Sequence, residues 1–324
     1  MQAEVACLGE AMALVADVEA PVADAHARLA GAEANVAVGL AAAGVRSSLI
    51  GRLGSDPFGE FVVAALRSAQ VETGAVEIDP QRPTGRYAKA VGVDDAGEPA
   101  TRMTYRRAGS AASAMDPDFL RSPAVASRLA AARIVHVSGI TAALSASCAA
   151  LMRELLAGPR AGLVAFDVNW REQMWPDGDP SEVVALAGAA DVVLTGADEA
   201  ERVFGTSDTG RLRELLPGPQ LLVVKDGSRR ALAIGRDGGV LATPALAVEV
   251  VEPVGAGDAF AAGLLTGLLR GEQLDRCLRR GHLGAAAVLT VPGDTAPPLD
   301  PALLDLDPDG WAALRITAET RVVT

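Results

Sequence analysis

The sequence predicts an α/β protein whose core is a mostly parallel β-sheet with helices on both faces, a three-layer arrangement. Three observations lead to this class. Apolar residues make up 50% of the 324 positions and charged residues 22%, so the chain can bury a sizeable core. From Arg133 onward, short β-branched runs alternate with helical segments. Between about residues 84 and 107 a mixed polar segment interrupts the alternation, which indicates a second, smaller sheet.

The first elements follow from apolar runs and their boundaries. Strands are expected at residues 5–8, 12–16 and 45–50, and a helix at about 34–43 that stops at Gly44. Asp56 and Pro57 form a good helix start, with Asp56 as the N-cap.

The polar segment is expected to form strands at 84–93 and 100–105, joined by a hairpin turn at 94–97. A small sheet built from about residues 10–30 and 84–107 suits a lid over a site. We therefore expect one domain over residues 1–324, with this lid inserted in its core.

The second half of the chain alternates strands and helices. Strands are expected at 134–137, 163–166, 192–195, 221–224, 231–234 and 240–242, and helices at 145–157 and 274–291. Ligands of open α/β sheets bind at the carboxyl ends of strands, so the polar residues that follow these strands are candidate site residues.

Composition excludes several classes of function. The chain has 29 basic and 41 acidic residues, a net charge of −12, and no basic block, which argues against nucleic acid as a partner. The start lacks a basic n-region, and no apolar run reaches membrane-spanning length. Three scattered cysteines suggest reduced core thiols in the cytoplasm. A homo-oligomer remains possible.

The stretch from Val248 to Gly271 carries the strongest chemical signal. We expect a strand at 248–251, then the small turn Gly255-Ala256-Gly257-Asp258, then a helix. Two glycines before a helix expose backbone N–H groups that bind phosphate. Asp258 could accept the proton of an attacking alcohol. The alternative is an ordinary strand-to-helix connection, since the chain has neither a Walker loop nor a G-x-G-x-x-G fingerprint.

This stretch resembles the C-terminal signature of the ribokinase-like (PfkB) sugar kinases, Asp-Thr-x-Gly-Ala-Gly-Asp-x-Phe-x-x-Gly. Every specified position from Gly255 onward matches, whereas Glu252 and Pro253 depart. The resemblance implies a ribokinase-like core with a small β-sheet lid. It also implies ATP as phosphoryl donor, Mg²⁺ carried with ATP and no dedicated metal site. The implied catalytic elements are the base Asp258 and the anion hole of Gly255, Ala256 and Gly257.

A second signature precedes the first expected helix. Gly31, Ala32, Glu33 and Asn35 lie in a G-A-E-A-N string. It resembles the sugar-binding Gly-Gly-x-x-x-Asn element of the same family and is closer to 2-keto-3-deoxygluconate kinases than to ribokinases. Asn35 as a plain helix cap is the alternative.

The lid segment contains both tyrosines of the chain, Tyr87 and Tyr105. The string from Tyr105 to Ser113 resembles the Tyr-Tyr-Arg-x-Gly-Ser-Ala element of the sugar-acid kinases, which implies that Arg107 faces a substrate carboxylate. A guanidinium matches a carboxylate bidentately, and neutral sugars lack that group. High β-propensity is the alternative reason for the tyrosines.

Further candidates follow the later strands. The resemblance places Asp167, Arg171 and Asp294 near the sugar, and Lys225, Gly227 and Glu199 near the nucleotide. The alternatives are an Asp167–Arg171 ion pair, a helix-ending turn at Asp294, a polar turn after Lys225 and an ordinary first-turn carboxylate at Glu199.

The sequence thus predicts ATP-dependent phosphorylation of the terminal hydroxyl of 2-keto-3-deoxygluconate. Two alternatives stay open. One is a fructokinase or ribokinase that acts on a neutral sugar. The other is a weakly catalytic sugar-acid-binding protein, suggested by Gly196 and Glu252, which depart from the family pattern.

Overall fold

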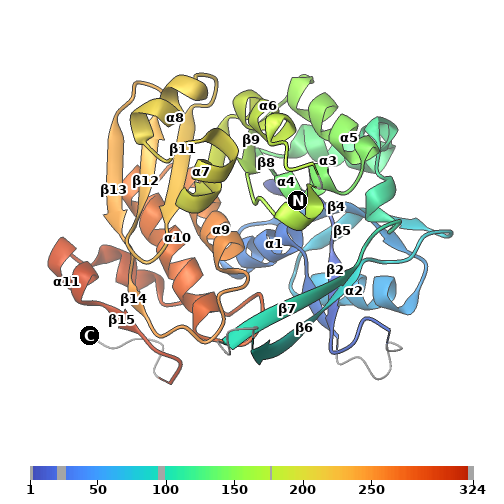
Figure 1. Cartoon of the computed structure of the whole chain (residues 1–324), viewed down its shortest axis with the longest axis horizontal. Coiled ribbons are helices and arrows are strands. Elements are labelled where there is room, and N and C mark those ends of the chain that lie inside the picture. The colour runs from blue at the N-terminus through green and yellow to red at the C-terminus, as the bar shows by residue number, and fades with distance from the viewer. Residues whose placement is uncertain (1–2, 20–26, 94–98, 176, 320–324) are drawn as a thin grey trace.

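The computed structural model describes residues 3–19, 27–93, 99–175 and 177–319. Its centre is a nine-stranded sheet in the order β13-β12-β11-β10-β9-β8-β1-β4-β5 (Figure 1). In this order, neighbouring strands from β11 to β5 pair in parallel. The hairpin strands β12 and β13 add two antiparallel pairings at the other edge, β11 with β12 and β12 with β13. The strands are β1 (Val5–Leu8), β4 (Ser47–Gly54), β5 (Glu72–Asp79), β8 (Ile134–Ser138), β9 (Leu163–Asp167), β10 (Val192–Gly196), β11 (Leu221–Asp226), β12 (Arg230–Gly235) and β13 (Val240–Pro244).

Helices cover both faces of this sheet, as the β-α alternation predicted (Figure 1). One apolar layer packs under α1 (Ala32–Ala42), α2 (Pro57–Ser68), α9 (Ala256–Leu269) and α10 (Leu274–Leu289). The other packs under α3 (Pro123–Ala131), α5 (Ala146–Ala157), α6 (Ser181–Ala189), α7 (Ala197–Phe204) and α8 (Thr209–Leu215). Successive β1 residues alternate between them, since Val5 and Cys7 join the first layer and Ala6 and Leu8 the second. The short helix α4 (Gly139–Ala143) directly follows β8.

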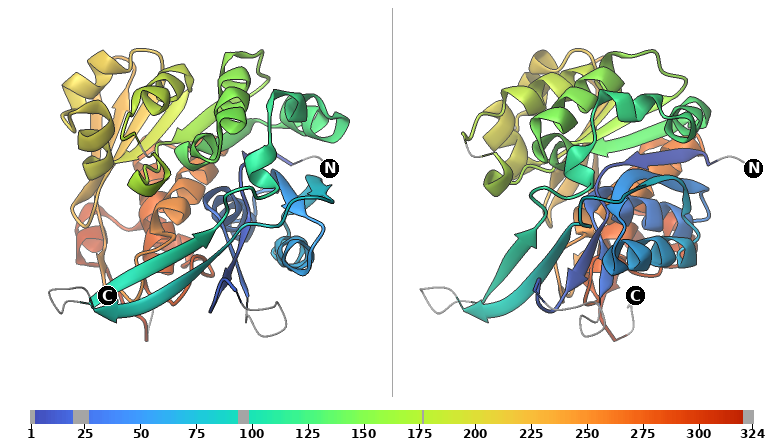
Figure 2. Two further views of the ribbon diagram at one scale, coloured as in Figure 1. Left: turned by 45° about the vertical axis from the view of Figure 1, so that its right-hand side comes forward. Right: turned by 90° about the vertical axis from the view of Figure 1, so that its right-hand side faces the viewer.

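A separate four-stranded small sheet, in the order β3-β2-β6-β7, forms from the two segments expected to make a lid. Its strands are β2 (Met12–Val15), β3 (Arg28–Ala30), β6 (Arg86–Val93) and β7 (Pro99–Arg106). Figure 2 shows that the β6–β7 hairpin projects away from the large sheet. The expected turn at 94–97 lies outside the described residues.

Two expectations about element ends were wrong. The strand expected at 248–251 is limited to β14 (Ala247–Val248), which pairs with β15 (Arg315–Ile316). Val250 and Val251 are half-exposed and have no strand partner, so their β-branched side chains alone do not extend the ladder. Helix α1 begins at Ala32 with Gly31 as its N-cap, so Asn35 is not a cap. Asp56, in contrast, caps α2 as predicted, accepting the Gly59 N–H at 2.8 Å.

Helices α1 and α9 pack very closely. A Cβ added to Gly39 of α1 would lie 2.7 Å from the Cβ of Ala262 of α9, inside van der Waals contact. Glycine at this position therefore lets the two helices approach each other. The remaining chain, including η5 (Pro301–Asp305) and α11 (Pro308–Ala313), packs against α10 around the buried Trp311. Within the described parts of the chain, the helices are too short or too polar to cross a bilayer.

Candidate active site

The turn before α9 is fixed by its backbone. Gly255 has φ +84°, and a Cβ there would lie 2.4 Å from the backbone oxygen of Asp294. Only glycine fits both constraints. The helix then starts at Ala256, so the N–H groups of its first turn have no intrahelical acceptors. Gly257 is exposed, which leaves this positive helix end open to an anion such as phosphate.

Asp258 meets Asn35 at this helix end. The Nδ2 of Asn35, in the first turn of α1, donates to Oδ2 of Asp258 at 2.8 Å, across 223 residues of sequence. The pKa of Asp258 is raised to about 7: desolvation is the largest cause, the nearby Asp167 carboxylate adds to the rise, and the Asn35 hydrogen bond and Lys225 oppose it. The two signature elements therefore form one site, and its carboxylate titrates where a general base is most effective.

Asp167 and Lys225 lie at the carboxyl ends of β9 and β11. The ammonium of Lys225 is 3.0 Å and 3.3 Å from the two oxygens of Asp167, so the Asp167–Arg171 ion pair considered above is wrong. Lysine reaches Asp167 because β9 and β11 flank β10 in the sheet. A Cβ on Gly257 would be 3.6 Å from the same ammonium, which places Lys225 beside the turn that starts α9.

Arg171 and Glu199 pair at the rim of this cluster. Nη1 of Arg171 is 3.5 Å from Glu199, and half of the Arg171 side chain is exposed. The other Glu199 oxygen accepts the Gly196 N–H at 2.8 Å, so Glu199 caps the start of α7. Gly227 lies in the turn after β11 with φ +52° and open space around it.

The G-A-E-A-N element has a more structural position than the resemblance implied. Glu33 is fully buried and accepts the hydroxyls of Ser138 and Thr141, both at 2.7 Å. Its predicted contact with a sugar conflicts with this burial, which also raises the pKa of Glu33. A Cβ on Gly31 would lie 2.2 Å from the backbone oxygen of Glu10, so the glycine makes room for the protein's own backbone. Ala32 is partly exposed beside it.

Arg107 is held by a carboxylate that the sequence did not single out. Its Nε and Nη2 lie 2.8 Å and 2.5 Å from Oε2 of Glu10, which is 1% exposed. The other Glu10 oxygen accepts the Ser110 hydroxyl at 2.8 Å. Nη1 of Arg107 faces the weakly accepting sulfur of Met174 at 3.3 Å. This nitrogen therefore retains capacity for a further acceptor.

The aromatic side chains of the small sheet lie beside this arginine. Tyr87 and Tyr105 stack with ring centroids 5.3 Å apart, and the Arg107 guanidinium lies 5.5 Å from the Tyr105 centroid. Tyr105 is 43% exposed, whereas Tyr87 is buried and its hydroxyl donates to Asp294 at 2.6 Å. The two rings thus form an apolar wall next to two polar groups.

Asp294 is engaged at both oxygens. Oδ2 accepts from Tyr87, and Oδ1 is 2.7 Å from the ammonium of Lys89 in β6. The same ammonium is 2.8 Å from Glu252, which immediately precedes Pro253. Asp294 is therefore more than a helix-ending turn, because it joins the small sheet to the segment under Gly255.

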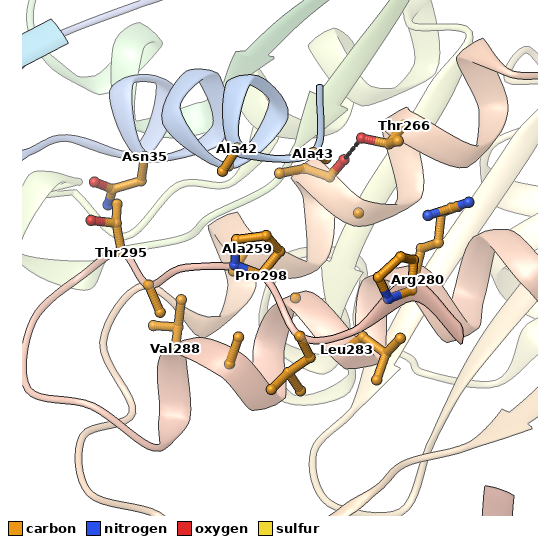
Figure 3. Close-up of a pocket in the computed structure, with 18 of the residues that line it drawn as sticks. Asn35, Ala42, Ala43, Ala259, Thr266, Arg280, Leu283, Val288, Thr295 and Pro298 are labelled. Atoms are coloured by element: carbon orange, nitrogen blue, oxygen red, sulfur yellow. Dashed lines mark hydrogen bonds between the residues drawn. The ribbon is translucent and has the colours of Figure 1, made fainter. Parts of the chain in front are cut away.

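A cavity of about 350 Å³ lies behind these groups, between α1, α9, α10 and the segment from residue 294 to 304. Figure 3 shows it lined mainly by small and apolar side chains, with Asn35 and Thr295 at one end and Arg280 at the other. Asp258, Lys225 and Arg107 are not part of its lining. The polar cluster, rather than this cavity, is therefore the candidate active site.

Sequence reasoning missed Glu10 and Lys89. Each had a signal: Glu10 interrupts an apolar run, and Lys89 is one of two lysines in the chain. Both lie inside or beside apolar segments, where a charged side chain is rarely buried without a partner.

A protein family and several known proteins resemble the chain over most of its length. The family model of the pfkB carbohydrate kinases matches residues 2–301. A 2-dehydro-3-deoxygluconokinase of Thermoproteus tenax is 35% identical over 259 residues, covering 78% of this chain and 76% of that protein. A fructokinase of Klebsiella pneumoniae is 35% identical over 240 residues, covering 72% and 74%. The crystal structure of a PfkB protein from Polaromonas sp. JS666 matches with a TM-score of 0.75 at 33% identity, covering 90% and 98%.

Proposed function

The chain belongs to the pfkB family of carbohydrate kinases, and we propose that it transfers a phosphoryl group from ATP to the terminal hydroxyl of 2-keto-3-deoxygluconate. The observation that carries the substrate assignment is Arg107. Its side chain is 13% exposed, lies beside Tyr105, and keeps Nη1 for a further acceptor. A sugar acid offers a carboxylate to such a group, and a neutral ketose does not. The Thermoproteus tenax relative supports the same substrate class.

The acceptor hydroxyl would be activated by Asp258. With a pKa of about 7, this carboxylate is a stronger base than an ordinary aspartate and is still largely ionised just above neutral pH. Its hydrogen bond from Asn35 fixes which oxygen faces the substrate. Asp258 would take the hydroxyl proton as the O–P bond forms and the bond to the leaving ADP oxygen breaks.

The phosphoryl group would be held at the start of α9. The N–H groups of Gly257 and Asp258, in the first turn of α9, lack intrahelical acceptors, whereas that of Ala256 donates to the Pro253 carbonyl at 3.4 Å; the helix dipole adds positive potential. Lys225 lies beside Gly257, where its ammonium balances charge that develops on the transferring group. Because the chain has a net charge of −12, such local cations matter for two anionic substrates.

Magnesium would arrive with ATP. The ion would be coordinated chiefly by the phosphates of ATP. Glu199, at the first turn of α7, would contact the ion or its water shell, the role that the family resemblance implies. The ion would neutralise phosphate charge during transfer.

A neutral sugar is the second candidate, and one contact favours it. Glu10 already pairs with Arg107 in a buried position, so the positive charge available to a substrate is reduced. The Klebsiella pneumoniae fructokinase has the same sequence identity to this chain, 35%, as the Thermoproteus tenax 2-dehydro-3-deoxygluconokinase.

A coupled ADP-release assay over sugar acids and neutral sugars tests the proposal directly. We expect 2-keto-3-deoxygluconate to give the highest kcat/KM. A higher value for fructose or ribose would reject the sugar-acid assignment and leave the kinase assignment intact. ADP release from none of the sugars, with sugar-acid binding retained in titrations, would indicate a binding protein.

A further inference from the structure

The chain contains two lysines, Lys89 and Lys225, against 27 arginines. Lysine carries a compact ammonium with three donors, whereas arginine carries a wide planar fork. In a chain that uses arginine at nearly every basic position, the two lysines mark places where a compact cation is required. Lys225 lies beside the turn that starts α9. The Lys89 ammonium lies 2.7 Å from the carboxylate of Asp294 and 2.8 Å from that of Glu252.

The position of Lys89 is well defined by its partners. Its side chain is 10% exposed, and its ammonium bridges Glu252 and Asp294. The remaining carboxylate oxygens are also engaged: Asp294 accepts from Tyr87 at 2.6 Å, and Glu252 accepts the Gly293 N–H at 3.2 Å. Burial lowers the pKa of Lys89, but the hydrogen bonds to Asp294 and Glu252 raise it more, so the ammonium stays charged.

The two bridged carboxylates flank the phosphate-binding turn. Glu252 lies three residues before Gly255 in the chain. Asp294 supplies the backbone oxygen against which Gly255 packs. Two carboxylates this close to one cation would repel each other without it. The distance between the segment that carries Glu252 and the segment that carries Asp294 therefore depends on the ammonium between them. The position of Gly255, which follows Glu252 in the chain and packs against Asp294, depends on it as well.

The cation itself comes from a different part of the fold. Lys89 lies on β6 of the small sheet, two residues after Tyr87 and on the same strand face. Figure 2 shows that the β6–β7 hairpin projects away from the core, and Lys89 and Glu252 are 163 positions apart in the sequence. The Lys89 bridge is thus a tertiary link between the small sheet and the turn.

We propose that Lys89 is a positioning residue, whose ammonium clamps Glu252 and Asp294 and so couples the small sheet to the geometry of the phosphate-binding turn. This inference rests on the kinase activity of the family and not on which sugar is used. Loss of the clamp should lower the rate of phosphoryl transfer more than the affinity for sugar, because the turn holds the transferring group rather than the sugar.

The test compares Lys89→Met and Lys89→Arg with a matched control, Arg106→Met. Arg106 lies on β7 of the same small sheet and pairs with Glu19, but both side chains are more than half exposed. We expect kcat to fall roughly 10- to 100-fold in Lys89→Met, since displacement of a catalytic group by about 1 Å costs up to about 10²-fold. The KM for the best sugar should change less than about threefold, and Arg106→Met should keep kcat within about twofold.

Lys89→Arg separates charge from shape. It keeps the positive charge, but a planar fork does not fit between two carboxylates spaced for one ammonium. We expect it to recover less than half of the kcat lost in Lys89→Met. Full recovery would mean that charge alone acts, and it would overturn the clamp.

A double-mutant cycle with Glu252→Gln supplies a readout that a purely structural role would not move. The amide oxygen introduced by Glu252→Gln can still accept the Gly293 N–H, and the substitution removes the carboxylate that Lys89 neutralises. Lys89→Met with Glu252→Gln should therefore have a higher kcat than Lys89→Met alone, because one fewer buried charge is left unpaired. If Lys89→Met fails to fold, the double variant still provides a protein on which kcat can be measured. The melting temperature is measured for every variant.

Three further results would also overturn the proposal. The first is an unchanged kcat in Lys89→Met. The second is a loss confined to the KM for sugar, which would make Lys89 a substrate contact. The third is a double variant no faster than Lys89→Met.

Discussion

Replacement of Arg107 decides the substrate class, and the structure fixes how the experiment must be done. Arg107 presents Nε and Nη2 to Glu10 and turns Nη1 toward Met174. A substrate carboxylate would thus gain one charge-assisted hydrogen bond from Nη1, worth about 1.5–3 kcal/mol. Removing it should reduce kcat/KM for 2-keto-3-deoxygluconate by roughly 10- to 150-fold.

The alanine variant carries a second cost. Glu10 is 1% exposed, so Arg107→Ala leaves a buried carboxylate without its cation. Breaking such a pair destabilises a protein by about 3–5 kcal/mol. Arg107→Lys is therefore the better variant, because its single ammonium can pair with Glu10 or with the substrate but cannot form the same fork to both. It should lose most of the activity on the acid with less loss of stability.

Initial rates of ADP release, measured on 2-keto-3-deoxygluconate and on fructose, provide the readout. Arg128→Lys is the matched control, because Arg128 is also a partly buried arginine paired with a glutamate, Glu72, but lies between α3 and the edge strand β5. The loss in Arg107→Lys should be large on the acid and small on fructose. Equal losses on both sugars would refute the reasoning: Arg107 would then support the shape of the site, and the fructokinase assignment would take precedence.

The remaining predictions concern the turn that contains Asp258, the proposed base. Asp258→Asn should lower kcat by a factor on the order of 10²–10⁴ while sugar binding in titrations is largely kept, and wild-type turnover would rule out Asp258 as the base. Because the base acts when deprotonated, kcat/KM should rise with pH through about 7 and fall below it. The raised pKa means that the folded state binds a proton more tightly than the unfolded chain, so ionised Asp258 destabilises the fold at high pH. Asp258→Asn should therefore melt higher than the wild type at pH 8, and this advantage should disappear near pH 4. Gly257→Val should weaken ATP binding more than sugar binding, since its side chain would project toward Lys225 at the phosphate site; the opposite order in separate titrations would assign the turn to the sugar. Gly255→Ala should instead lower the melting temperature, because its Cβ would overlap the Asp294 backbone, and an unchanged melting temperature would contradict this packing.

The layered α/β fold could be predicted because its cause is local. Apolar strands alternate with helices along the chain, and parallel strands bury both faces, so the pattern itself specifies the layers. The exception at 248–251 shows the limit of this reasoning. A β-branched run forms a strand only where a neighbouring strand is available, and that neighbour, β15, is two residues long.

The site could be predicted residue by residue but not pair by pair. Asn35 and Asp258 were each identified, yet their hydrogen bond depends on two helices that are 223 positions apart in sequence. The partner of Asp167 was misassigned for the same reason: Arg171 is close in sequence, but Lys225 is close across the sheet. The role of a buried charge such as Glu10 can be inferred only once its partner of opposite charge is known. The order of residues in the sequence does not reveal that the partner is Arg107.

The close contact between α1 and α9 has a consequence for how mutations in this protein should be interpreted. Gly39 lies one helical turn after Asn35, and Ala262 lies one turn after Asp258. Their contact sets the distance between the two helices, one turn away from the hydrogen bond between Asn35 and Asp258, the proposed base. A single methyl group added to Gly39 would widen the gap and separate Asn35 from Asp258 without touching either. Reaction rate can thus be adjusted from a position that an inspection of the site alone would classify as ordinary helix packing.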